Sequence, residues 1–184
     1  MKKLTASKAV VSSEKPRRKS WVMAGFVVIL AAVVVGVVLW QNHDKPSSDN
    51  PTTNPTLQSL YAGNLSIEDP ATHDKLVKAL SAAGNKTDKI ALLNALASNS
   101  LSNKHYQQAV DYAVQARDAG DKTSQTALGI AQNYEDNLHN KSKALDYYRA
   151  ALSSAKTEKK QQTNPYADSL ITYIEDKLTT LGGQ

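Results

Sequence analysis

The sequence predicts an all-α protein in which one N-terminal transmembrane helix precedes a domain of antiparallel helix pairs. Three observations predict this class. Residues 21–40 hold no charged side chain, and all but two of them are apolar. From Thr56 onward, apolar residues recur at intervals of three and four, which is the spacing of an amphipathic helix. That second region contains no run of β-branched residues that would predict a strand.

The segment from Trp21 to Trp40 is the predicted transmembrane helix. Twenty residues at 1.5 Å per residue span about 30 Å, the thickness of the hydrocarbon core. The tail, residues 1–20, carries seven basic side chains and one acidic one. The positive-inside rule therefore predicts a single-pass protein of the plasma (inner) membrane with a cytoplasmic N-terminus and an extracytoplasmic C-terminal domain.

A cleaved signal peptide is the alternative interpretation of this segment. The apolar run is longer than a usual signal-peptide core of about 7–15 residues. No small-x-small cleavage site follows Leu39-Trp40. Both observations favour an uncleaved anchor. Within the span, Ala32 and Gly36 form a small-xxx-small pair that would allow a weak homodimer.

Residues 41–56 are predicted to be a linker between the anchor and the domain. They are rich in Pro, Ser, Thr and Asn and contain almost no apolar side chain. Such a composition neither forms a helix nor buries a core, so we expect an extended spacer. The helical domain is then predicted to occupy residues 57–184.

Turn and cap residues divide this domain into short helices. Asp69-Pro70 is a cap followed by proline at the first helical position, and Gly84-Asn85 ends that helix. Thr87 or Asp88 is the predicted cap of the next helix, which Ser102-Asn103 ends. Helix pairs are expected at 88–119 and 122–155, because each stretch contains two amphipathic segments separated by a turn signal. A polar stretch, 156–164, separates the second pair from a last helix.

The two pairs resemble tetratricopeptide (TPR) and Sel1-like helical repeats. Tyr106-x-x-Ala109-x-x-x-Ala113-x-x-Ala116 is similar to the second helix of a TPR motif. Leu128-Gly129, followed by the stretch 143–151 (KALDYYRAA), resembles a Sel1-type repeat. The resemblance covers about half the chain and departs from both patterns, since the first pair lacks Leu-Gly and the second has an irregular internal gap. It implies an α-solenoid, and a generic antiparallel bundle with alanine-rich seams is the alternative.

Composition and motifs give no support for catalysis or for a bound cofactor. The chain has no cysteine, and no two of its four histidines share the i, i+4 spacing of a metal site. No nucleophile elbow, phosphate loop or dinucleotide fingerprint is present. Outside the tail, residues 41–184 carry 15 basic and 16 acidic side chains, so no nucleic-acid partner is expected.

The resemblance implies a groove lined by the first helix of each pair, which binds a protein or peptide partner outside the cytoplasm. By position, the groove residues would be Asn94, Ser98, Gln125 and Gln132. Tyr106, Tyr134, Tyr148 and Tyr173 are predicted core residues, whereas Tyr61, Tyr112 and Tyr147 are candidates for contact.

The functional hypothesis is a membrane-anchored interaction module, an adaptor or assembly factor of the cell envelope. The alternatives are a domain that binds cell-wall polymer or another ligand, and a structural membrane protein with homotypic contacts.

Overall fold

The computed structural model describes residues 54–182, which contain seven α-helices, one π-helical turn and no strand. In chain order the elements are α2 (Pro55–Tyr61), α3 (Ala71–Ser81), α4 (Lys86–Ser102), α5 (Tyr106–Asp118), α6 (Ser124–Gln132), η1 (Asn133–Asn137), α7 (Lys141–Gln161) and α8 (Ala167–Thr180). The prediction of an all-α domain is confirmed for these residues. No helix among them has the length and apolarity to cross a bilayer. The predicted anchor, residues 21–40, lies outside the described residues.

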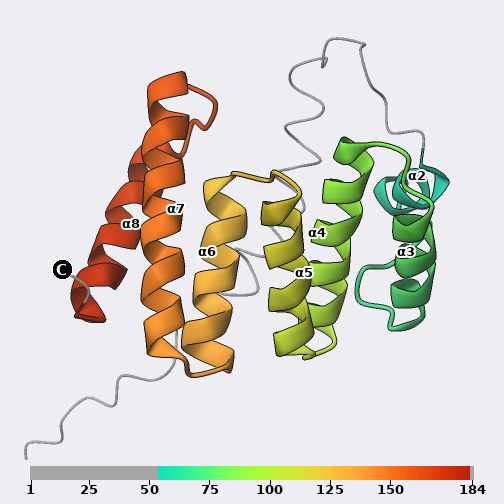
Figure 1. Cartoon of the computed structure of the whole chain (residues 1–184), viewed down its shortest axis with the longest axis horizontal. Coiled ribbons are helices and arrows are strands. Elements are labelled where there is room, and N and C mark those ends of the chain that lie inside the picture. Colours follow the sequence, from blue (N-terminus) through green and yellow to red (C-terminus); the bar gives the residue numbers. More distant parts are fainter. Residues whose placement is uncertain (1–53, 183–184) are drawn as a thin grey trace, which may run out of the picture. The chain divides into compact units, whose positions relative to one another are not determined.

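Helices that follow one another in the chain pack side by side (Figure 1). The closest partners are α4 with α5, α6 with α7, and α7 with α8, and α3 packs on α4. Short turns reverse the chain between partners, so neighbouring helices run antiparallel. This arrangement is compatible with an α-solenoid.

Asparagine and threonine side chains fix several helix starts. The side-chain oxygen of Asn54 accepts hydrogen bonds from the backbone N–H groups of Thr56 and Leu57, so α2 begins at Pro55. The helical domain therefore starts two residues inside the predicted linker. Asn85, rather than Thr87 or Asp88, caps α4, because its Oδ1 accepts from the N–H of Asp88 at 2.8 Å. Asn85 therefore caps α4, whereas α3 ends earlier, at Ser81.

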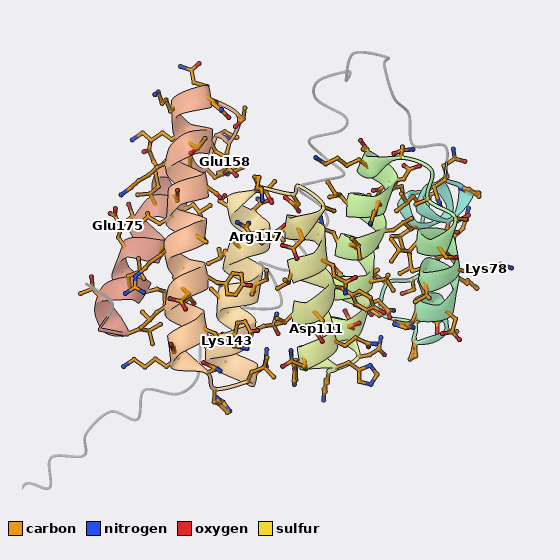
Figure 2. All side chains as sticks on the ribbon, viewed as in Figure 1. Lys78, Asp111, Arg117, Lys143, Glu158 and Glu175 are labelled. Carbon is orange, nitrogen blue, oxygen red and sulfur yellow. The ribbon has the colours of Figure 1, made fainter. Side chains whose placement is uncertain are left out.

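The helix α7 is longer than predicted. The expected polar connection at 156–164 is helical as far as Gln161. Two exposed ion pairs connect this polar segment to α8: Lys156 pairs with Glu175 at 3.0 Å and Lys159 with Asp168 at 2.5 Å. Figure 2 shows Glu175 on α8 beside this part of α7.

A carboxylate of α7 caps the start of α6. Glu158 accepts hydrogen bonds from the backbone N–H and the hydroxyl of Ser124, both at 2.6 Å. Asn164, in the turn before α8, donates to the same carboxylate at 2.8 Å. Because the N–H groups at a helix start lack partners inside the helix, a carboxylate there is favoured by both hydrogen bonding and the helix dipole. One side chain thus links α6, α7 and the turn that leads to α8.

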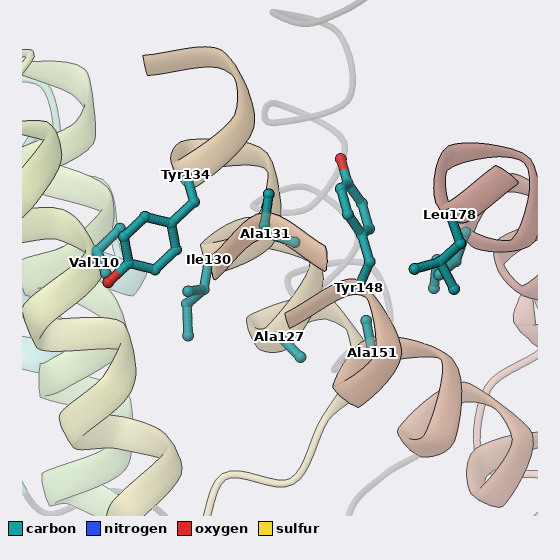
Figure 3. Packing of buried hydrophobic residues seen from close by; sticks show 10 residues of the cluster. Val110, Ala127, Ile130, Ala131, Tyr134, Tyr148, Ala151 and Leu178 are labelled. Atoms are coloured by element: carbon teal, nitrogen blue, oxygen red, sulfur yellow. The ribbon is translucent and has the colours of Figure 1, made fainter. Parts of the chain in front are cut away.

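The apolar interior consists of two clusters. We call the first the N-terminal core, and its buried members are Leu57, Leu76, Ala79, Leu92, Ala95 and Leu96 from α2, α3 and α4. The C-terminal core has buried members Val110, Ala127, Ile130, Ala131, Tyr134, Ala144, Tyr148, Ala151, Ile174 and Leu178. Figure 3 shows Tyr148 between the helices that carry Ala131 and Leu178. Alanines at the α6–α7 crossing allow the two helices to approach closely, and the ring of Tyr148 fills the space beside these alanines.

Burial corrects part of the tyrosine prediction. Tyr134 and Tyr148 are buried, as predicted. Tyr106 is only partly buried. Tyr173 is 36% exposed, so its placement in the core was wrong. The next residue on α8, Ile174, fills the C-terminal core instead, because neighbouring residues on a helix point about 100° apart.

Candidate functional site

The four predicted groove residues lie on the first helix of each predicted pair. Asn94 and Ser98 are on α4, and Gln125 and Gln132 are on α6. Gln125 is exposed, and the other three are partly buried. No hydrogen bond joins any two of the four, and two of them, Asn94 and Gln132, bond to other residues.

Asn94 takes part in a hydrogen-bond network centred on Asp121, in the turn between α5 and α6. Asp121 Oδ2 accepts from Asn94 Nδ2 at 2.9 Å and from the Thr126 hydroxyl at 2.7 Å, and Oδ1 accepts from the N–H of Thr123 at 2.9 Å. Burial disfavours the charge of this carboxylate, but the hydrogen bonds outweigh burial and hold the pKa of Asp121 below its usual value. The network links α4 to α6.

Gln132 lies where α6 meets α8. Its side-chain amide donates to the hydroxyl of Tyr173 at 3.2 Å. Gly129, one turn earlier on α6, has open space where a side chain would lie. Gln125, Gly129 and Gln132 are spaced four and three residues apart, so they form one stripe along α6. The stripe combines two amide side chains with an accessible stretch of backbone between them.

A charged cluster that the sequence analysis did not predict lies beside this stripe, at the π-helical turn η1. Glu135 Oε2 accepts from the hydroxyl of Tyr148 at 2.5 Å, and Oε1 accepts from Lys177 Nζ at 2.8 Å. The side chains of Glu135 and Lys177 are only 20% and 24% exposed. The carboxylate thus ties α7 and α8 to η1.

Electrostatics in this cluster follow from burial and from the Glu135 charge. Burial and the hydrogen bond to Glu135 raise the pKa of Tyr148 far above its usual value. Burial alone would lower the pKa of Lys177, but the hydrogen bond to Glu135 and nearby negative groups raise it. Burial and the neighbouring charge of Glu135 raise the pKa of Asp136. The carboxylate of Glu135 therefore lies between a neutral tyrosine hydroxyl and an ammonium group, and the three groups form a structural tie between helices.

The π-helical turn explains why Glu135 reaches α8. Leu138 N–H bonds to the carbonyl of Asn133, five residues earlier, so the turn is wider than an α-helical one. Sequence spacing alone predicts an ordinary helix through Tyr134 to Leu138. Lys177 is 42 residues from Glu135 in the chain. Only the acidic pair Glu135-Asp136 signalled this site, and adjacent acids on a helix are usually solvated.

Two depressions on the described surface are open and shallow. One shallow depression is lined by His105, Tyr106, Gln107 and Gln108, and another by Ser153, Lys156, Thr157, Lys160 and Gln161. Neither contains a predicted groove residue. Within residues 54–182, no three histidine or carboxylate side chains are grouped as metal ligands would be.

No protein-family model, no curated protein and no solved structure matches this chain. A functional proposal for this chain therefore rests on its own residues and their contacts.

Proposed function

We propose that the chain is a membrane-anchored, extracytoplasmic TPR-like module that binds a protein or peptide partner, as an adaptor or assembly factor of the cell envelope. The predicted anchor at residues 21–40 and the basic tail support the location. The antiparallel helix pairs support the class, because stacked helix pairs present long surfaces that bind extended chains.

The observation that carries the proposal is the stripe of Gln125, Gly129 and Gln132 on α6. Seven residues separate the two glutamines, which places them about 10.5 Å apart along the helix axis. Each amide offers both a donor and an acceptor, which suits the backbone of an extended peptide at about 3.3 Å per residue. Gly129 leaves room for that backbone to approach.

The neighbouring helices α4 and α8 extend this surface on both sides. The Asp121 network joins α4 to α6, and the bond between Gln132 and Tyr173 joins α6 to α8. Ser98 on α4 and Tyr173 on α8 flank the stripe, and both are at least partly exposed. Tyrosine is a frequent contact residue in protein recognition because its ring is large and its hydroxyl is polar.

Photocrosslinking in intact cells tests the proposal. A photoreactive residue is placed at Ser98, Gln125 or Tyr173, and at two exposed control positions on the second helices, Gln115 on α5 and Ser153 on α7. Asn94 is avoided because its amide is bonded to Asp121. We expect the same small set of envelope proteins at the three positions on α4, α6 and α8 and not at the controls.

Three results would contradict this proposal. Equal capture at all five positions would mean that no particular face binds. Crosslinks that join only copies of this chain would replace the partner-binding hypothesis with the homotypic structural one. Covalent capture of cell-wall polymer in place of protein would favour the polymer-binding alternative.

A further inference from the structure

The two apolar cores of the domain share no buried residue. The N-terminal core is built from α2, α3 and α4, with Tyr112 of α5 packed against its edge. The C-terminal core is built from α6, η1, α7 and α8, and α5 supplies Val110, with Ala113 and Val114 at the margin. Helix α5 also packs closely on α4. Residues 54–182 therefore contain two apolar cores, and α5 contributes side chains to both of them. We call α2–α5 and α6–α8 the two halves of the domain.

The apolar contact between the halves is small. From α5, the C-terminal core receives one buried residue, Val110, and the partly buried Ala113 and Val114. Ala109 and Ala116 of α5 are also buried but belong to neither core. These are small side chains, so they remove less apolar surface from water than the leucines that fill the N-terminal core. The apolar side chains that α5 contributes to the junction are therefore smaller than the leucines that fill the N-terminal core.

Hydrogen bonds at the α5–α6 turn also connect the two halves. A single oxygen of Asp121, Oδ2, accepts one hydrogen bond from Asn94 of the first half and another from Thr126 of the second half. The turn begins at Gly120, whose φ of +114° suits only glycine, and the amine of Lys86 occupies the space where a side chain would lie. The carboxylate of Asp121 is buried, so its bonds are shielded from water.

We propose that the domain bends at the α5–α6 turn as two rigid bodies, α2–α5 and α6–α8, and that Asp121 is the latch that holds one relative orientation. Stacked helix pairs contact only their neighbours, so a change at one junction alters curvature without disturbing either core. The proposal concerns the fold and does not depend on the proposed function.

Distance measurements between spin labels test this device in the full chain, purified in a mild detergent. The chain has no cysteine, so each introduced thiol is labelled uniquely. Cysteines at Lys89 on α4 and Ser169 on α8 report across the junction. Cysteines at Lys141 on α7 and Ser169 report within the second half. All three positions are exposed.

The variant Asp121→Asn removes the latch with little change in shape. Whichever way the new amide is turned, its NH₂ group faces a donor, either Thr123 N–H or the pair Asn94 and Thr126. We expect a shifted and broader distance distribution across the junction and an unchanged one within the second half. Asp118→Asn, an exposed carboxylate at the end of α5, is the matched control and should change neither distribution.

An unchanged cross-junction distribution in Asp121→Asn would overturn the proposal. So would equal broadening of both distributions, because Asp121 would then stabilise the fold as a whole. If Asp121→Asn does not fold, Thr126→Val removes only the hydroxyl from the second half. The proposal then requires that the cross-junction distance distribution of Thr126→Val broadens while its distribution within the second half stays unchanged.

Discussion

Replacing Tyr148 with alanine is expected to lower the free energy of unfolding by about 3–5 kcal/mol, the usual cost of deleting a buried aromatic ring. Tyr148 is fully buried at the crossing of α6, α7 and α8. Its neighbours include Ala131 and Ala151, whose side chains are too short to fill the cavity that the substitution leaves. The cavity should therefore remain largely open.

The variant Tyr148→Phe separates packing from hydrogen bonding. It keeps the ring and removes the hydroxyl that donates to Glu135. The carboxylate keeps Lys177 as a partner, so we expect a smaller loss, about 1–2 kcal/mol. Urea unfolding of the full chain in a mild detergent, followed by circular dichroism, gives both values. Equal losses for Tyr148→Ala and Tyr148→Phe would mean that the ring does not fill the core as described.

Replacing Glu158 with alanine is the second change with a large expected effect. The substitution removes the acceptor of the N–H and hydroxyl of Ser124, a fully buried residue, and of the amide of Asn164. Leaving buried donors without partners costs about 1–3 kcal/mol each. We expect the free energy of unfolding to fall by about 2–4 kcal/mol, with α6 losing amide protection in hydrogen exchange before α4 does.

Glu175→Ala is the matched control for Glu158→Ala. Glu175 also belongs to the α7–α8 region, but its ion pair with Lys156 joins side chains that are 52% and 55% exposed. Exposed ion pairs contribute about 0.5 kcal/mol or less. A loss from Glu158→Ala no larger than that from Glu175→Ala would show that Glu158 acts as an ordinary surface charge.

Local rules predicted most of the secondary structure. Period-three-and-four spacing, Pro70 and the Gly84-Asn85 and Ser102-Asn103 breaks located helices to within a few residues. The same rules missed the last turns of α7. Lys156 to Gln161 are helical although no apolar residue recurs in this stretch, because Lys, Glu and Gln are strong helix formers; the exposed ion pairs with α8 add little to that tendency.

Side-chain networks were less predictable than helices. Asn94 was selected for its position on a first helix, which is correct, but its bond to Asp121 joins residues 27 apart in the chain. Glu135 and Lys177 are further apart still, and the π-helical turn that aims Glu135 has no distinct sequence signal. The roles of Ser98, Gln125 and Gln132 in binding stay predictions, because local pattern and fold place these side chains without showing what they bind.

The side of the membrane on which the helical domain lies decides the proposed function. It is measured by placing a single cysteine at Thr172, which is exposed on α8, or at Ser12 in the basic tail, and treating intact cells with a membrane-impermeant maleimide. We expect labelling of the Thr172→Cys variant in intact cells and of the Ser12→Cys variant only after permeabilisation. Labelling of Thr172→Cys only after permeabilisation would place the domain in the cytoplasm and contradict the account.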